Sequence, residues 1–259
     1  MRASLIQINV DPAEPVAERR ERAAALVREQ AGSDLVVLPE LWHVGAFAHE
    51  SFAAEAETPD GPTAAAMARA ARDAGVWLHA GSIAERDAGG SLYNTSLVFS
   101  PAGELVRSYR KIHRFGFDKG EAVLMAAGTE PATVALPAVT AGLATCYDLR
   151  FPELFRALVD AGAQMFVVPA GWPERRRGHW TLLARARAVE NQAYVLACGT
   201  AGTHAGVEQA GHSLVVDPWG DVVAEAGAGE EVLTAEIDPA RVAEVREEFP
   251  ALKDRVLGR

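Results

Sequence analysis

The sequence of 259 residues contains only two cysteines, Cys146 and Cys198. Two cysteines are too few for the disulfide framework of a secreted domain, and they fit a reducing compartment. Long apolar runs are also missing, because nothing approaches roughly 18 uninterrupted apolar residues. Met1 and Arg2 lead straight into a strand-like segment at 3–10, which leaves no room for an apolar signal segment. We therefore expect a cytoplasmic protein with no membrane partner.

Basic charge is scarce as well. The chain has 25 Lys and Arg against 35 Asp and Glu, a formal net charge of −10, and its longest basic run covers only residues 175–177. Nucleic acids and anionic membranes require basic surface, so neither is an expected partner. We find no Pro/Ser-rich linker and no internal repeat, while 49% of the residues are hydrophobic. The sequence predicts one domain over residues 1–259.

Short apolar or β-branched runs alternate with amphipathic stretches along the chain. Alternating elements with buried strands predict an α/β layered fold. Strand-turn-strand units, such as the one around Pro101-Ala-Gly103, add antiparallel pairs and predict mixed sheets. The strand-like runs lie at 3–10, 34–39, 76–83, 93–100, 104–110, 132–136, 140–145, 164–169, 193–199, 211–217, 221–226 and 231–237, and the helical stretches at 15–31, 62–74, 151–161, 179–191 and 239–248.

Cys146 stands where a small-residue apolar run, 139–145, gives way to a helix-forming segment, 148–158. A thiol at this position lies on a tight strand-to-helix turn, and Pro152 and Glu153 are typical of a helix N-terminus. Because a helix N-terminus carries partial positive charge, we expect it to lower the pKa of Cys146 and to favour the thiolate. The position is typical of a nucleophile.

Two other apolar runs end in ionisable residues: segment 34–40 ends in Glu40, and segment 103–111 ends in Lys111. Ligands of α/β proteins commonly bind where strand ends meet, so we expect Glu40, Lys111 and Cys146 to converge. Taken alone, a glutamate at a strand end or a lysine in a basic stretch is usually solvated. If the three converge, Glu40 can exchange protons with the thiol and Lys111 can stabilise an oxyanion.

The remaining candidate groups suggest no cofactor. Cys198 is most simply a small buried hydrophobe, and the alternative is a disulfide or redox partnership with Cys146. The seven histidines form no metal pair at i, i+4 spacing, no cysteine pair has zinc-ligand spacing, and no nucleotide-binding glycine pattern occurs. The sequence predicts an enzyme without metal or cofactor.

Five segments, spread in order over essentially the whole chain, resemble the nitrilase superfamily. Each motif alone is weak, but five in the family's order and approximate spacing are specific. The resemblance implies a four-layer αββα sandwich, and an assembly that is a homodimer or larger. The segments are Leu38-Pro-Glu-Leu-Trp42, Tyr109-Arg-Lys-Ile-His113, 145–153, Ala170-Gly-Trp-Pro173 and 179–192.

The resemblance also implies a Glu-Lys-Cys triad, here Glu40, Lys111 and Cys146, with a second glutamate that positions the lysine and the substrate. Glu121 matches that second glutamate by its place after the lysine and seven residues before Gly128. Its alternative is a surface loop residue. In the expected mechanism the backbone N–H of Tyr147, directly after the cysteine, joins Lys111 in stabilising the oxyanion.

The segment Cys146-Tyr-Asp148, followed by Leu-Arg-Phe-Pro-Glu, resembles the Nit-type and omega-amidase branch. Those enzymes hydrolyse the terminal amide of small carboxylated substrates such as 2-oxoglutaramate. Such a carboxylate needs a cationic anchor, ideally a forked one, and Arg150 and the run 175–177 are the candidates. Arg150 has an alternative role in capping or salt-bridging its helix, and the run can be a solvated loop or an oligomer contact. Trp172 is a further expected substrate-binding residue.

Other functions stay open at this point. An N-carbamoyl amide hydrolase or a nitrilase would use the same triad on a different electrophile. A thiol redox protein and a catalytically silent binding module are alternatives from other classes. The absence of a Cys-x-x-Cys pair weakens the redox alternative, and the retention of all three triad residues weakens the silent one.

Overall fold

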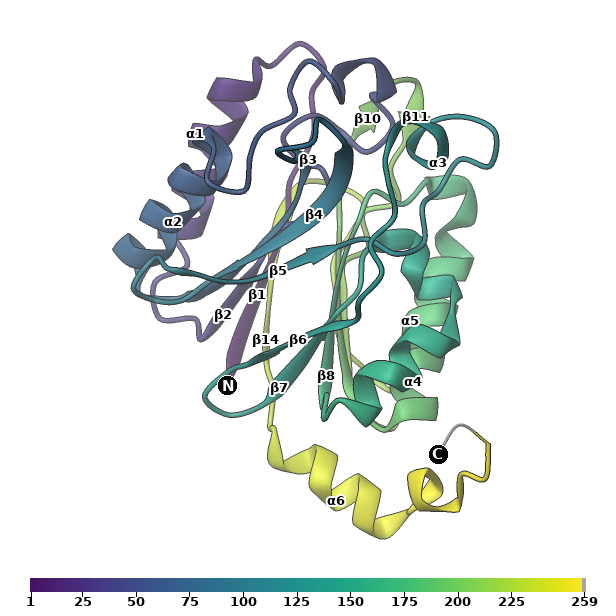
Figure 1. Ribbon diagram of the computed structural model, residues 1–259. Helices are drawn as coiled ribbons and strands as arrows, with labels where there is room; N and C mark the ends of the chain where they lie inside the picture. The colour runs from purple at the N-terminus through teal and green to yellow at the C-terminus, as the bar shows by residue number, and fades with distance from the viewer. Residues whose placement is uncertain (258–259) are drawn as a thin grey trace.

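The computed structural model describes residues 1–257. Two helices, α1 (Val16–Arg28) and α2 (Pro62–Ala74), cover the outer face of one sheet. Two others, α4 (Pro152–Asp160) and α5 (Arg177–Asn191), cover the outer face of a second sheet, and the two sheets face each other between the helix layers (Figure 1). The predicted αββα sandwich is confirmed.

Both sheets have six strands and both are mixed, as predicted. In the first sheet the neighbours β1, β2 and β3 run parallel, and the other pairs are antiparallel. Its order is β14 (Glu231–Glu236), β1 (Arg2–Gln7), β2 (Leu35–Val37), β3 (Trp77–Arg86), β4 (Leu92–Phe99) and β5 (Leu105–Arg110).

The second sheet repeats this plan, with β7, β8 and β9 parallel at its centre and antiparallel pairs outside them. A short hairpin of β10 (Thr203–His204) and β11 (Val207–Glu208), which the sequence did not predict, lies outside both sheets. The order of the sheet is β13 (Val222–Glu225), β12 (Leu214–Val216), β9 (Tyr194–Gly199), β8 (Met165–Ala170), β7 (Thr140–Leu143) and β6 (Ala132–Ala135).

The main core lies between the sheets and beneath α4 and α5. Leu5 and Val37 from the first sheet belong to the same buried cluster as Leu143, Val167 and Leu196 from the second. Strands covered on both faces lose their apolar/polar alternation, and all six residues of β8 are accordingly buried. This explains why the central strands form near-continuous apolar runs in the sequence.

One expected helix differs from the prediction at its start. The segment 148–158 does not continue as an α-helix from the strand: Cys146–Arg150 forms a 3₁₀ helix, and α4 begins only at Pro152. Proline is tolerated in the first turn of a helix, but it disfavours the α-conformation in the residue before it. The 3₁₀ helix and α4 therefore stay separate. Not predicted either are α3 (Glu121–Leu124) and the 3₁₀ helices His49–Ser51, Glu174–Arg176 and Ala251–Asp254.

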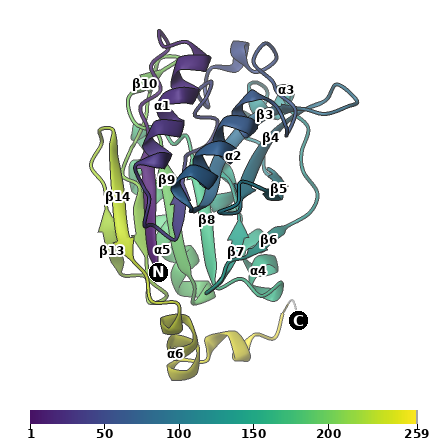
Figure 2. The ribbon, with the colours of Figure 1, turned by 90° about the vertical axis from the view of Figure 1, so that its left-hand side faces the viewer.

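The C-terminal helix α6 (Ala240–Glu248) lies at the end of the sandwich away from α3 (Figures 1 and 2). Arg246 Nη2 donates to the Ala163 carbonyl at 3.1 Å and so ties this helix to the second sheet's side of the molecule. Within residues 1–257 no helix has both the length and the apolar content needed to cross a bilayer. The organisation of residues 1–259 as one domain stays a prediction, and residues 258 and 259 lie outside the described residues.

Candidate active site

Four of the predicted side chains line one pocket at the end of the sandwich opposite α6. Glu40 follows β2 and Lys111 follows β5, so both come from the first sheet. Cys146 follows β7 of the second sheet, and Glu121 begins α3. The pocket encloses about 400 Å³ including its mouth. This volume lies in the range of small-molecule binding sites.

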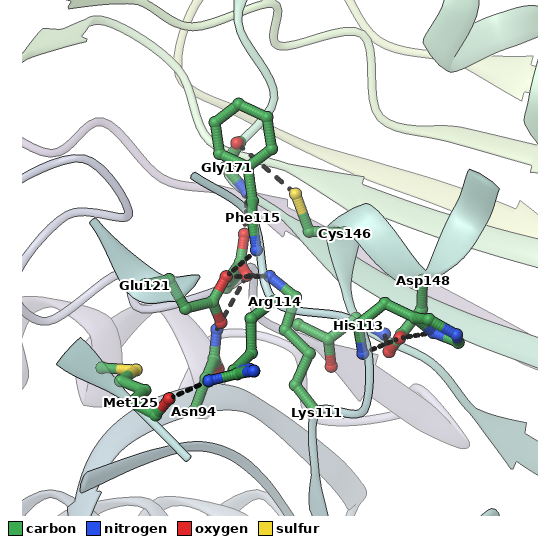
Figure 3. A network of polar contacts seen from close by, with 12 residues as sticks. Asn94, Lys111, His113, Arg114, Phe115, Glu121, Met125, Cys146, Asp148 and Gly171 are labelled. Carbon is green, nitrogen blue, oxygen red and sulfur yellow. Dashed lines mark hydrogen bonds and ion pairs between the residues drawn. The ribbon is translucent and has the colours of Figure 1, made fainter. Parts of the chain in front are cut away.

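The Lys111 ammonium lies between two carboxylates. Its Nζ donates to Glu40 Oε1 and to Glu121 Oε2, each at 2.7 Å. Figure 3 shows Lys111 beside Glu121. All three side chains are buried, with exposed fractions of 2% for Lys111 and Glu40 and 5% for Glu121. Burial disfavours the charge on Lys111, but Glu121 and Glu40 outweigh burial and hold its pKa well above the usual value. The pocket therefore contains a permanent buried cation.

Asn94 connects the two carboxylates from β4. Its Nδ2 donates to Glu40 Oε1 at 2.8 Å and to Glu121 Oε1 at 2.9 Å. The Gly171 N–H donates to the other oxygen of Glu40, also at 2.8 Å. Asn94 was not predicted from the sequence, although an amide inside the buried part of a strand was a usable signal. Glu40 thus accepts three hydrogen bonds, which fix the direction of its carboxylate.

Glu121 is held at the start of α3, where the Phe115 N–H donates to its Oε2 at 2.8 Å. Burial raises the pKa of Glu121 against the opposing charge of Lys111, and the neighbouring Glu40 adds to the rise. The alternative of a solvated surface position for Glu121 is wrong, because its side chain is buried against Lys111. Two carboxylates share one ammonium at this site.

Cys146 adopts an uncommon backbone conformation, with φ at +48°. A positive φ is sterically costly for a residue with a side chain, and such residues cluster at functional sites. The turn is stabilised by a capping box in which Asp148 accepts from the Thr145 N–H at 2.9 Å. Cys146 Sγ lies 3.6 Å from the Gly171 carbonyl oxygen, to which it donates (Figure 3).

The predicted lowering of the Cys146 pKa is wrong. Burial and the negative charge of Glu40 raise the pKa of this thiol well above its usual range, although Lys111 acts in the opposite direction. The effect of a helix dipole falls off within the first turn, and α4 begins only at Pro152. The resting site therefore contains a neutral thiol beside a carboxylate.

Asp148 connects the cysteine turn to the segment around the end of β5, which contains Lys111. Its fully buried carboxylate accepts from the Tyr109 hydroxyl at 2.7 Å and from the His113 N–H at 3.0 Å, and it also contacts His113 Nδ1 at 2.7 Å. Tyr109 and His113 flank Lys111 in the sequence. These bonds fix Lys111 relative to the turn of Cys146.

Both predicted substrate-binding residues line the same pocket. The Arg150 guanidinium lies 5.0 Å from the ring centroid of Trp172, and its Nη2 donates to His179 Nδ1 at 3.3 Å. Among residues 1–257, Arg150 forms no salt bridge, so the salt-bridge alternative finds no support. Of the run 175–177, only Arg176 lines the pocket. The Tyr147 ring packs edge-on against Phe151, with centroids 5.2 Å apart.

The second cysteine does not line this pocket. Cys198 belongs to β9, is fully buried, and donates to the carbonyl oxygens of Ile6 at 3.5 Å and Val37 at 3.4 Å. Both cysteines are free, so no disulfide joins them. Over the described part of the chain, no group of three His, Cys, Asp or Glu side chains is placed to hold a metal ion.

The buried ammonium, the paired carboxylates and the thiol are groups that can together carry out a hydrolysis. The model of the carbon-nitrogen hydrolase family matches residues 2–247, and the chain belongs to this family. It is therefore an enzyme that hydrolyses carbon–nitrogen bonds, and the resemblance to the nitrilase superfamily is confirmed.

Particular relatives cover nearly the whole chain. The chain is 42% identical to the 2-oxoglutaramate amidase of Paenarthrobacter nicotinovorans, over 96% of this chain and 87% of that protein. It is 38% identical to the omega-amidase of Mus musculus, over 98% and 94% of the two chains. A similar solved structure is that of a CN-hydrolase superfamily protein from Xanthomonas campestris, with an arsenic adduct in its active site. Its TM-score to this chain is 0.91 at 35% sequence identity, and the match covers 100% of this chain and 99% of that one.

Proposed function

We propose that this enzyme hydrolyses the terminal amide of a small carboxylated substrate, such as 2-oxoglutaramate, to a carboxylic acid and ammonia. The observation that carries the proposal is the pocket itself, where the thiol of Cys146 and the ammonium of Lys111 share a narrow space with Arg150. The names of the relatives, 2-oxoglutaramate amidase and omega-amidase, support the same substrate class.

In the proposed first step, Glu40 accepts the proton of Cys146 as the sulfur attacks the amide carbon. Because burial and the charge of Glu40 keep the thiol protonated at rest, the thiolate forms only as it reacts. The carbonyl oxygen becomes an oxyanion, which the Lys111 ammonium and the backbone N–H of Tyr147 stabilise. Fixed positive charge in a pocket that excludes water is commonly the largest single contribution to such a step.

Collapse of the tetrahedral intermediate breaks the carbon–nitrogen bond. Glu40 returns its proton to the leaving nitrogen, ammonia departs, and the acyl group stays on Cys146 as a thioester. Glu40 then accepts a proton from a water molecule that attacks the thioester, and the carboxylic acid leaves with the thiol restored. Glu121 holds Lys111 in place throughout, through the 2.7 Å contact to its Nζ.

We assign the binding of the substrate carboxylate to Arg150, with Trp172 as the apolar wall beside it. A guanidinium offers two parallel donors to a carboxylate, which a lysine cannot reproduce. Arg150→Lys should therefore lower kcat/KM for a carboxylated amide by about tenfold and have a smaller effect on a neutral amide. Equal losses on both substrates would show that Arg150 supports the turn after Cys146 instead.

The direct test is a panel of substrates assayed for ammonia release. It contains 2-oxoglutaramate, neutral amides of the same length, N-carbamoyl compounds and nitriles. We expect 2-oxoglutaramate to be hydrolysed far better than the neutral amides. A preference for neutral amides, carbamoyl compounds or nitriles rejects the substrate assignment while leaving the carbon–nitrogen hydrolase chemistry in place.

We further propose that the enzyme works without metal or cofactor, in the cytoplasm, as a homodimer or larger homo-oligomer. The family resemblance supports the oligomer, and the small number of cysteines supports a reducing compartment. Full activity should survive prolonged incubation with a chelator, and light scattering on the purified protein should give at least twice the 27.5 kDa of one chain. Activity that is lost to chelation and restored by a divalent ion contradicts the proposal.

A further inference from the structure

Two guanidinium groups share the pocket with the reactive side chains. Arg150 and Arg176 both line it, and both are partly buried. Throughout residues 1–257, neither has a carboxylate within ion-pair distance, whereas the adjacent Arg177 lies 3.5 Å from Glu174. A partly buried guanidinium without an anionic partner is suited to binding an anionic ligand.

Aromatic rings of the pocket wall hold both arginines in place. Arg150 lies over Trp172, and Arg176 lies over Phe115 at 5.2 Å from the ring centroid. Trp172 also couples the two, because its Nε1 donates to the Arg176 carbonyl at 2.8 Å while its ring lies beneath Arg150. Contact with a ring face orients a guanidinium and leaves the N–H groups at its edge available to a ligand.

The ionisable side chains of the pocket have an excess of one positive charge, which a bound anion would neutralise. The pocket contains three cationic side chains, Lys111 and the two arginines, but only two carboxylates. The thiol of Cys146 is neutral and adds no negative charge, so one positive charge has no counterpart. Burial and then repulsion from Arg175 and Arg150 lower the pKa of Arg176. A carboxylate bound between Arg150 and Arg176 would relieve this repulsion and balance the remaining charge.

We propose that Arg176 and Arg150 together bind the carboxylate of the substrate, and that Arg176 is the member of the run 175–177 that determines the preference for carboxylated amides. The inference rests on the proposed amidase function and adds a second anchor to it. Arg175 provides a matched comparison, since it is adjacent and exposed and does not line the pocket.

The experiment compares two amides of equal length, succinamate and butyramide, which differ in a carboxylate against a methyl group. Steady-state constants are measured for the wild-type protein and for Arg176→Gln, Arg176→Lys and Arg175→Gln. Arg176→Gln should lower kcat/KM for succinamate roughly 10- to 150-fold, mostly through KM, with a clearly smaller loss on butyramide. For Arg176→Lys, kcat/KM for succinamate should lie between the values of the wild type and Arg176→Gln, because lysine keeps the charge but loses the two parallel donors. Arg175→Gln should match the wild type on both amides.

A second measurement separates binding from chemistry. Succinate, which carries the same carboxylate but no amide, should inhibit the wild-type enzyme competitively, and its inhibition constant should rise in Arg176→Gln but not in Arg175→Gln. Equal behaviour of the Arg175 and Arg176 variants, or equal losses of Arg176→Gln on both amides, overturns the assignment of Arg176. A wild-type enzyme that prefers butyramide instead overturns the proposed function, and this comparison needs no variant.

Discussion

The two thiols of this chain are both buried and both have a pKa raised by burial, yet their surroundings differ. Cys198 is fully enclosed between the sheets, in a regular strand, and donates to two backbone carbonyls. Cys146 is 8% exposed, sits at a positive φ, and faces Glu40 and Lys111. Burial alone therefore does not distinguish the proposed nucleophile from the other cysteine.

What distinguishes Cys146 is a set of charged groups that can move a proton away from it and stabilise the charge that develops next. Lys111, Glu40 and Glu121 supply those charges, and no comparable group contacts Cys198 among the interactions of the described residues. In the proposed mechanism, the reactivity of Cys146 therefore depends on a proton acceptor and a fixed cation, and not on a thiolate present at rest.

The largest expected effect separates the two cysteines directly. Cys146→Ala should abolish turnover, with a loss on the order of 10⁶ in kcat, because the nucleophile acts as part of a unit. Cys198→Ala should keep most of the activity. Both variants are assayed for ammonia release, and comparable losses from both would favour a redox pair over a single nucleophile.

The next effect tests the fixed cation. Lys111→Ala should lower kcat by at least roughly 10²–10³, the usual cost of losing one oxyanion donor. Because Glu40 and Glu121 would then be buried without their partner, the variant should also lose stability, typically about 3–5 kcal/mol. Activity is measured well below the unfolding temperature, and an unchanged kcat in the folded variant would remove Lys111 from the mechanism.

Asn94 tests whether the arrangement of the charges matters as well as their presence. Asn94→Ala removes the donor shared by Glu40 and Glu121 and should lower kcat roughly 10- to 150-fold, the range for hydrogen bonds to charged groups. KM for the amide should change little, because Asn94 does not line the pocket. Asn94→Asp keeps the shape but adds a third carboxylate and should lose at least as much. A change confined to KM would contradict a positioning role.

The pH dependence of alkylation gives a further test. Since the pKa of Cys146 is raised, the thiol stays protonated through the usual titration range of cysteine, and its alkylation by iodoacetamide should rise about tenfold per pH unit above neutrality. Cys198 should stay unmodified in the folded protein. Peptide mass spectrometry follows both sites, and a rate at Cys146 that is already constant near pH 7 would indicate a resting thiolate.

The smallest expected effect concerns stability. Replacing each cysteine by glycine or by alanine should give opposite orders of stability at the two positions. At the positive φ of Cys146, Cys146→Gly should be about 0.5–1 kcal/mol more stable than Cys146→Ala, because glycine adopts this conformation without a steric cost. In strand β9, Cys198→Gly should be less stable than Cys198→Ala by a similar amount. Urea unfolding of the four variants measures this, and the same sign at both positions would refute the strain at Cys146.

Much of the fold could be predicted because its signals are local. The strands β8 and β9 and the helices α2 and α5 lie close to their predicted ranges, since apolar runs, prolines and glycines mark them in the sequence. The positions of Glu40, Lys111 and Cys146 at strand ends were local signals as well.

Other properties were not accessible because they depend on contacts between distant segments. Lys111 looks exposed in its basic stretch, and its burial follows only from Glu40 and Glu121 on either side of it. The raised pKa of Cys146 depends on burial and on Glu40, which the chain brings together across two sheets. Asn94 could be noticed as an amide in the buried part of a strand, but its role could not be predicted, because that role comes from bridging two carboxylates of distant segments.

The division of the pocket between two sheets has a consequence for how the protein is made. Glu40 meets Gly171 across 131 positions of the chain, and the first sheet is complete only when β14 pairs with β1. Contacts of such long range form slowly, because a large loop must close before they contribute. During translation, Lys111 and Cys146 thus leave the ribosome well before residues 231–236, which complete the sheet. Hydrolytic activity should accordingly appear only near the end of synthesis, as a property of the docked sheets and not of any nascent half.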